Sequence, residues 1–79
     1  MFISNRAQTS RRVLEDYIVN EVHARGNTAV SAENVAYALD TRSSLVYSSW
    51  CRELCQRNGL RWHEHVERGL LTFHKEAYH

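Results

Sequence analysis

Three glycines and the absence of proline decide where regular structure can stop in this 79-residue chain. Gly26 and Gly59 each follow a stretch with the apolar spacing of a helix. Glycine is common just past a helix end because it adopts the left-handed conformation without strain. Gly69 lies in "ERG", between two stretches in which apolar and polar residues alternate. We therefore expect helices before Gly59 and a hairpin after it.

The first helical pattern runs from about residue 10 to residue 25. Its apolar residues recur at spacings of one, three and four, which is the period of an amphipathic helix. Thr9 or Ser10 can cap its start, and Gly26 its end. The positions expected to face the core are Val13, Leu14, Tyr17, Ile18 and Val22.

A turn and a few residues able to form a short strand follow in "GNTAV", and two further helices flank the polar stretch "DTRSS". The helix over about 32–39 begins at the cap residue Ser31. The helix over about 43–57 is expected to bury one side and to expose the other. Its buried side consists of Val46, Tyr47, Trp50, Cys51 and Leu54, and its exposed side of Leu45, Ser48, Ser49, Arg52 and Gln56.

The last stretch, "LRWHEHVERGLLTFHK", changes to a period of two, which indicates strands. The apolar positions of this alternation are Leu60, Trp62, Val66, Leu71 and Phe73. We predict a two-stranded hairpin over about 60–75, with its turn at Glu67–Gly69 and Gly69 in the left-handed conformation. The apolar residues at 62, 66 and 70 would also fit a helix.

The middle of the chain, "NVAYALDTRSSLV", resembles the helix-turn-helix of the winged-helix superfamily. The positions that match its consensus in register are Val35, Ala36, Leu39 and Val46, while Asp40 stands where glycine is usual. The stretch "NGLRWHEHVERGLLTF" resembles the wing hairpin that follows, so the resemblance covers roughly residues 9–75. It implies an α+β fold: one small winged-helix domain over 1–79, with three helices and a C-terminal two-stranded β-hairpin wing.

The resemblance also implies a function, because winged helices place the third helix in the major groove of duplex DNA. The stretch "DTRSS" would then aim that helix, whose free N–H groups and positive dipole end can meet a phosphate. The residues implied to face bases or phosphates are Arg42, Ser44, Ser48, Ser49 and Arg52, with Arg61, His63 and Arg68 on the wing. Arg11 and Arg12 fall in the first turn of the first helix, where the dipole disfavours positive charge and a docked anion would relieve it. The alternative is an ordinary solvated surface.

Charge and one exposed apolar residue leave a second class of function open. Residues 41–61 carry four arginines and one glutamate, which is +4 − 1 = +3, although the whole chain is only +1. Glu64 and Glu67 on the expected wing would repel phosphates, and Leu45 is apolar on the exposed side of the third helix. Winged helices also dock on proteins. The alternative to a small DNA-binding transcriptional regulator is therefore an adaptor or inhibitor, of the kind that mobile elements encode, bound to a host protein or nucleoprotein complex.

The sequence also bears on metal binding, catalysis and oligomeric state. Cys51, Cys55, His63 and His65 are potential zinc ligands, but C-x3-C, seven residues and H-x-H is not a recognised zinc spacing. Two half-buried cysteines and two surface histidines are the alternative. No catalytic constellation is evident, so we expect neither an enzyme nor a cofactor. A homodimer would double the phosphate contacts of so small a domain.

No apolar run approaches the roughly 20 residues that a membrane span needs. The N-terminal stretch "MFISNRAQTSRR" also lacks the apolar core of a signal peptide. We therefore expect a cytoplasmic chain without a membrane partner.

Overall fold

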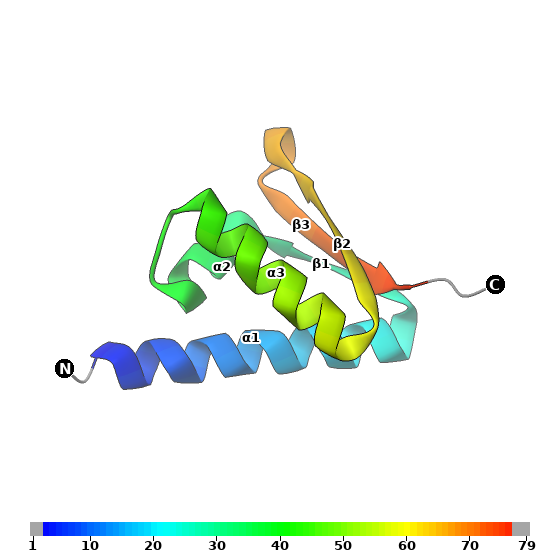
Figure 1. Ribbon diagram of the computed structural model, residues 1–79, viewed down its shortest axis with the longest axis horizontal. Helices are drawn as coiled ribbons and strands as arrows, with labels where there is room; N and C mark the ends of the chain where they lie inside the picture. The colour runs from blue at the N-terminus through cyan, green and yellow to red at the C-terminus, as the bar shows by residue number, and fades with distance from the viewer. Residues whose placement is uncertain (1–2, 77–79) are drawn as a thin grey trace.

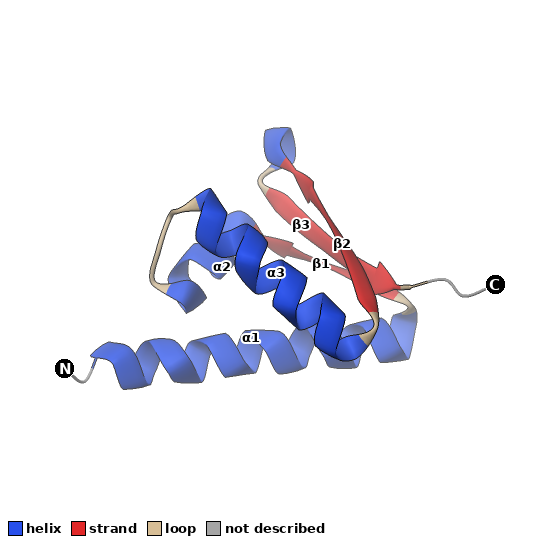
Figure 2. Cartoon of the chain, in the orientation of Figure 1, coloured by secondary structure: helices blue, strands red, loops and turns tan. Residues whose placement is uncertain are grey.

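The computed structural model describes residues 3–76, with side chains from residue 10 onward. In this part of the chain the elements are α1 (Ile3–Arg25), β1 (Asn27–Ser31), α2 (Ala32–Leu39), α3 (Ser44–Asn58), β2 (Leu60–His65), the 3-10 turn η1 (Val66–Arg68) and β3 (Leu70–Lys75). Helix α1 runs along one side of the domain, with α2 and α3 above it and the hairpin of β2 and β3 beside α3 (Figure 1; Figure 2). The described chain is thus a small α+β domain.

The sheet has three antiparallel strands in the order β1-β3-β2, so the prediction of a two-stranded hairpin was wrong in its strand number. The hairpin itself is present over residues 60–75, with Trp62 opposite Phe73. The third strand comes from "GNTAV", where Val30 lies opposite Leu71. Pairing with β1 satisfies the backbone groups on the second edge of β3. The sequence shows that this stretch can be a strand, but it does not show which strand it would join.

The core fills the space between α1, α3 and the inner face of the sheet. Its buried apolar side chains are Ile18, Val22, Val30, Val35, Ala38, Trp50, Cys51, Leu54, Cys55, Leu60, Leu71 and Phe73. Trp50 of α3 meets Phe73 of the central strand edge to face, with ring centroids 6.1 Å apart. Aromatic pairs prefer this arrangement, and these two rings join the helical layer to the sheet.

The helices agree with the sequence expectation in two respects only partly. Helix α1 begins earlier than expected, and the buried sides of α1 and α3 are centred on other residues than we expected. Helix α2 has the predicted bounds, but α1 begins at Ile3. Thr9 and Ser10 therefore do not cap its start, and Arg11 and Arg12 do not lie in its first turn as we expected. Its core stripe passes through Leu14, Ile18 and Val22, each four residues from the last. Residues one position earlier are turned about 100° toward solvent.

Three side chains that we expected in the core are therefore largely exposed. Val13 is 62% exposed, Tyr17 48% and Val46 42%. Adjacent apolar residues on a helix cannot all face the same neighbour. The periodicity shows that a helix is amphipathic but locates the centre of its buried side only to within about one residue.

The hairpin turn places glycine as predicted. Val66–Arg68 form one 3-10 turn, and Gly69 follows at φ 62° in the left-handed conformation. Val66 is 75% exposed at this turn, so it does not continue the buried alternation of β2.

Asp40 ends α2 in the conformation that makes glycine usual at this position. Its φ and ψ are 55° and 44°. Its N–H donates to the carbonyl oxygen of Tyr37, and the N–H of Thr41 donates to that of Ala36 at 3.1 Å, which together form a Schellman motif. The motif turns the chain sharply between α2 and α3, and Asp40 bears the strain of the turn.

Replacing Asp40 by glycine should raise the free energy of unfolding. An L-residue in the left-handed region costs about 1–2 kcal/mol, although aspartate tolerates it better than most. A new glycine also makes the unfolded chain more flexible, which offsets part of the gain. We expect a net rise of about 0.5 kcal/mol for Asp40→Gly in urea denaturation, and a fall for Asp40→Ala. A glycine variant less stable than the parent would contradict a strained Asp40.

Candidate nucleic-acid interface

Helix α3 turns one face to the core and leaves the other uncovered. Its buried residues, Trp50, Cys51, Leu54 and Cys55, are two adjacent pairs one turn apart. The side chains that continue along the opposite face are Leu45, Ser49, Arg52 and Gln56, all exposed, with the half-buried Ser48 at its margin. We call these five residues the α3 face. Four of the five agree with the predicted exposed side, whereas Ser48 is half-buried. Val46, which we expected to be buried, and Glu53, one turn after Ser49, are exposed as well.

The turn before α3 is held by local hydrogen bonds. The Oγ1 of Thr41 accepts from the N–H of Ser43 at 3.1 Å, and the carbonyl oxygen of Thr41 accepts from the Tyr47 hydroxyl at 3.1 Å. Ser43 occupies the cap position, but its side chain makes no capping bond to the helix. The stretch "DTRSS" thus sets the direction of α3 through Asp40 and Thr41.

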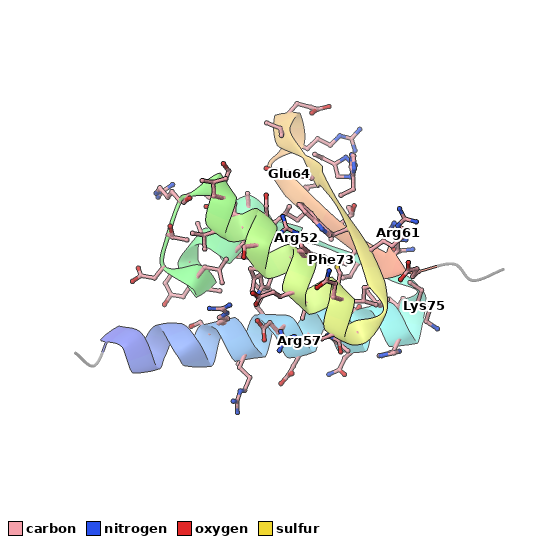
Figure 3. All side chains as sticks on the ribbon, in the orientation of Figure 1. Arg52, Arg57, Arg61, Glu64, Phe73 and Lys75 are labelled. Atoms are coloured by element: carbon pink, nitrogen blue, oxygen red, sulfur yellow. The ribbon has the colours of Figure 1, made fainter. Side chains whose placement is uncertain are left out.

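Two hollows run along the sides of the α3 face. On the α1 side, Arg11 shares a hollow with Leu45 and Ser49. On the hairpin side, Arg61 of β2 shares another, of about 510 Å³, with Arg52 and Gln56 of α3. Figure 3 shows Arg52 on α3 and Arg61 on the hairpin beside it. The structure therefore brings a basic side chain to each flank of the helix.

Glu15 joins α1 to α3 and places Arg11. The indole N–H of Trp50 donates to the Glu15 Oε2 at 2.6 Å, and the Arg11 Nε lies 3.4 Å from the same oxygen. The Arg57 Nη2 lies 4.0 Å from the Glu15 Oε1. Because this carboxylate binds groups from two helices, it keeps Arg11 beside α3. Sequence reasoning missed Glu15; its only signal was the spacing of four from Arg11.

The remaining predicted site residues are spread over other surfaces. Arg42 is exposed, but it lines a hollow on the α2 side with the acidic Glu33 and Asp40. Arg12 is exposed one position round the helix from Arg11, and it lines neither hollow of the α3 face.

The two other predicted residues, Ser44 and Arg68, are exposed on different elements. Ser44 is exposed at the first position of α3. Arg68 is exposed in the turn at the tip of the hairpin, which projects from the body of the domain (Figure 1).

The charges around the α3 face are mixed. Glu53 lines the hollow that contains Arg11, and Glu76 lines the one that contains Arg52 and Arg61. Each acid reduces the positive potential that a phosphate would meet. The pair of hollows therefore carries three arginines and two glutamates, a small basic surplus.

The four zinc candidates do not converge. Cys51 and Cys55 are buried on the core side of α3. His63 and His65 alternate with Trp62 along β2 and so lie on the outer face of the sheet. Their rings meet edge to face at 4.6 Å, and the His65 Nε2 is 3.2 Å from the Thr72 Oγ1. Within residues 3–76 there is no group of three or more potential metal ligands.

Burial also makes both thiols poor ligands and poor nucleophiles. Desolvation raises the pKa of Cys51 to about 12, with smaller contributions from Cys55 and Glu64. Desolvation and then Glu76 raise the pKa of Cys55 to about 11. Zinc and electrophiles react with the thiolate, which is scarce at neutral pH in both cases.

No family model, curated protein or solved structure matches the chain. Among the described residues, no helix is both long and apolar enough to cross a bilayer. The geometry around α3 is therefore the basis for inferring a function.

Removing the Glu15 carboxylate should destabilise the domain markedly. Trp50 is only 2% exposed, so Glu15→Ala would leave a buried indole N–H without its partner. We expect a loss of about 2 kcal/mol in urea denaturation, and a smaller loss for Glu15→Gln, which keeps an acceptor. Glu21→Ala is the matched control, because it removes only a surface pair with Arg25; that pair should be worth less than about 1 kcal/mol. Equal losses for the two alanine variants would contradict the role assigned to Glu15.

Both thiols should be inert in the native state, and stability should fall in alkali. Ellman's reagent at pH 8 should react with neither cysteine until denaturant is added.

The free energy of unfolding should also depend on pH in alkali. Because the folded pKa values are about 12 and about 11, above the ordinary 9.0, the unfolded chain binds fewer protons than the folded chain above pH 9. The stabilising effect is complete below pH 9 and is lost as pH rises toward 11–12. A Cys51→Ala/Cys55→Ala variant should show a shallower alkaline decline, and parallel declines would refute the assignment.

Proposed function

We propose that this domain is a winged-helix DNA-binding module, a small regulator that reads duplex DNA with α3. The order of helices and strands, the three-stranded sheet and the register match of the helix-turn-helix stretch support this classification. The observation that carries the proposal is the uncovered α3 face with Arg11 on one flank and Arg61 on the other.

The dimensions of the helix and of DNA suit one another. An α-helix with its side chains is about 10–12 Å across, and the major groove of B-DNA is about 12 Å wide. Ser48 and Ser49 are small enough to allow close approach to the floor of the groove. Phosphates line both rims of the groove, so basic groups on both flanks of the helix can bind them.

Arg52 is the residue on the α3 face best suited to read a base. It is exposed near the middle of the helix, and its planar guanidinium can donate two hydrogen bonds to one guanine. Arg11 is 47% exposed, so its pair with Glu15 positions the guanidinium and leaves it accessible to a phosphate. Ser44 at the start of the helix would add a weaker phosphate contact. Arg42, Arg12 and Arg68 lie away from the α3 face and would add only long-range attraction to the DNA.

The proposal can be tested by fluorescence anisotropy with a mixed-sequence duplex at low and physiological salt. Binding should weaken steeply with salt, because each phosphate contact releases a counterion. Arg52→Ala should weaken binding about tenfold, or about 1.4 kcal/mol, and Arg61→Ala somewhat less. Arg25→Ala changes the net charge equally at the last turn of α1, so it should have little effect. No binding at low salt, or equal effects of Arg25→Ala and Arg52→Ala, would overturn the proposal.

One observation favours the alternative of a protein-docking adaptor or inhibitor. Leu45 is 82% exposed and Val46 42%, and both line the hollow beside Arg11. Two exposed apolar residues at the start of α3 would suit contact with a protein surface. Leu45→Ala distinguishes the two functions, because it removes the most exposed apolar side chain of α3 and leaves every arginine in place. It should therefore weaken docking on a protein surface strongly, and DNA binding less than Arg52→Ala does.

A further inference from the structure

An apolar groove lies on the other side of α1 from the α3 face. It has a volume of about 530 Å³ and is lined mainly by Val13, Leu14 and Tyr17 of α1, Ala29 and Val30 of β1, and Tyr37 of α2. None of the described side chains that line it is charged. In a chain with 24% charged residues, a neutral lining drawn from three elements is a distinct feature.

The groove is bordered by apolar side chains that the domain itself leaves uncovered. Tyr37 is 67% exposed, Val13 62% and Tyr17 48%. These three residues are half of the large hydrophobic side chains that are exposed among those described. Contiguous exposed apolar surface around a hollow marks an interaction site in soluble proteins.

We propose that a second copy of this chain covers the groove, forming a two-fold symmetric dimer. In such an interface the same patch occurs on both partners, so a patch with a net charge would meet the same net charge on the partner. A lining without charges avoids that repulsion, whereas a nucleic acid or a charged peptide would require complementary charges. The patch also combines a hollow with a projecting Tyr37, and a self-complementary contact requires both.

The exposed area indicates a weak dimer. An aromatic side chain buries about 150–250 Å² when fully covered, so Tyr17 and Tyr37 together leave about 200 Å² outside in each copy. Two copies would bury about 400 Å² from these tyrosines and somewhat more with Val13, which is below the roughly 1,000 Å² expected of a stable specific interface. Interfaces of this size are transient, so the dimer should depend on protein concentration.

The groove and the α3 face can be occupied together. Residues two positions apart on an α-helix point about 200° away from one another. Arg11 and Glu15 point toward α3, so Val13 and Tyr17, each two positions later, point to the opposite side of α1. A dimer through the groove would leave both copies of α3 uncovered. The proposal does not depend on what α3 binds.

Sedimentation equilibrium over about 10 μM to 1 mM tests the proposal directly, since weak interfaces dissociate in this range. The apparent mass of the full chain should rise from 9.3 kDa toward twice that value as concentration increases. Val13→Glu would place two carboxylates in the shared interface, and Tyr37→Ser would remove the projecting ring. Each should raise the dissociation constant at least tenfold. Because both residues are exposed, circular dichroism should show that both variants remain folded.

Val66→Glu is the matched control, because Val66 is 75% exposed at the turn of the hairpin and is not one of the residues that line the groove. This variant should dimerise like the parent. A parent chain that stays at 9.3 kDa up to 1 mM would overturn the proposal. So would a dimer that Val66→Glu disrupts, or one that neither Val13→Glu nor Tyr37→Ser weakens, because the interface would then lie elsewhere.

Discussion

The arrangement of the domain depends on Trp50, which binds both neighbours of α3. Its ring packs edge to face on Phe73 of the central strand, and its indole N–H donates to Glu15 of α1 at 2.6 Å. One side chain therefore contributes apolar area to the core and a charge-assisted hydrogen bond at the margin of the core. Because both contacts must form at once, the position of α3 relative to α1 and the sheet is restricted. The direction of the α3 face follows from this restriction.

Helix α1 separates two surfaces of different chemistry. On one side Glu15 and Arg11 form the polar junction with α3, and on the other Val13 and Tyr17 border the neutral groove. A basic flank suits a polyanion, and an uncharged hollow suits an apolar partner. A small domain can hold both because successive helix positions are turned by about 100°. The proposed DNA contact and the proposed dimer contact would therefore not compete for the same surface.

Local signals in the sequence predicted the parts of the structure that depend on few residues. The cap residue Ser31 and the apolar spacing after it predicted α2, and Gly69 predicted the left-handed turn of the hairpin. The helix-turn-helix register identified Asp40 as a residue in the place of a glycine, and it adopts the left-handed conformation. Of the predicted site, Ser48, Ser49 and Arg52 lie on the α3 face, and Arg11 and Arg61 lie beside it. Arg12 and Arg42 are turned elsewhere, because their directions depend on packing around α1 and α2.

The amino-acid sequence by itself determined the bounds of α2 and the position of the hairpin turn, since caps, turns and hydrophobic period act over only a few residues. It also determined that α3 would expose serines and an arginine. Only the tertiary structure decided that β1 joins β3, that Glu15 binds Trp50, and that Val13 and Tyr17 stay outside the core. These outcomes depend on contacts between residues far apart in the chain. Several pairings satisfy the same local pattern, and the packing of the whole domain selects among them.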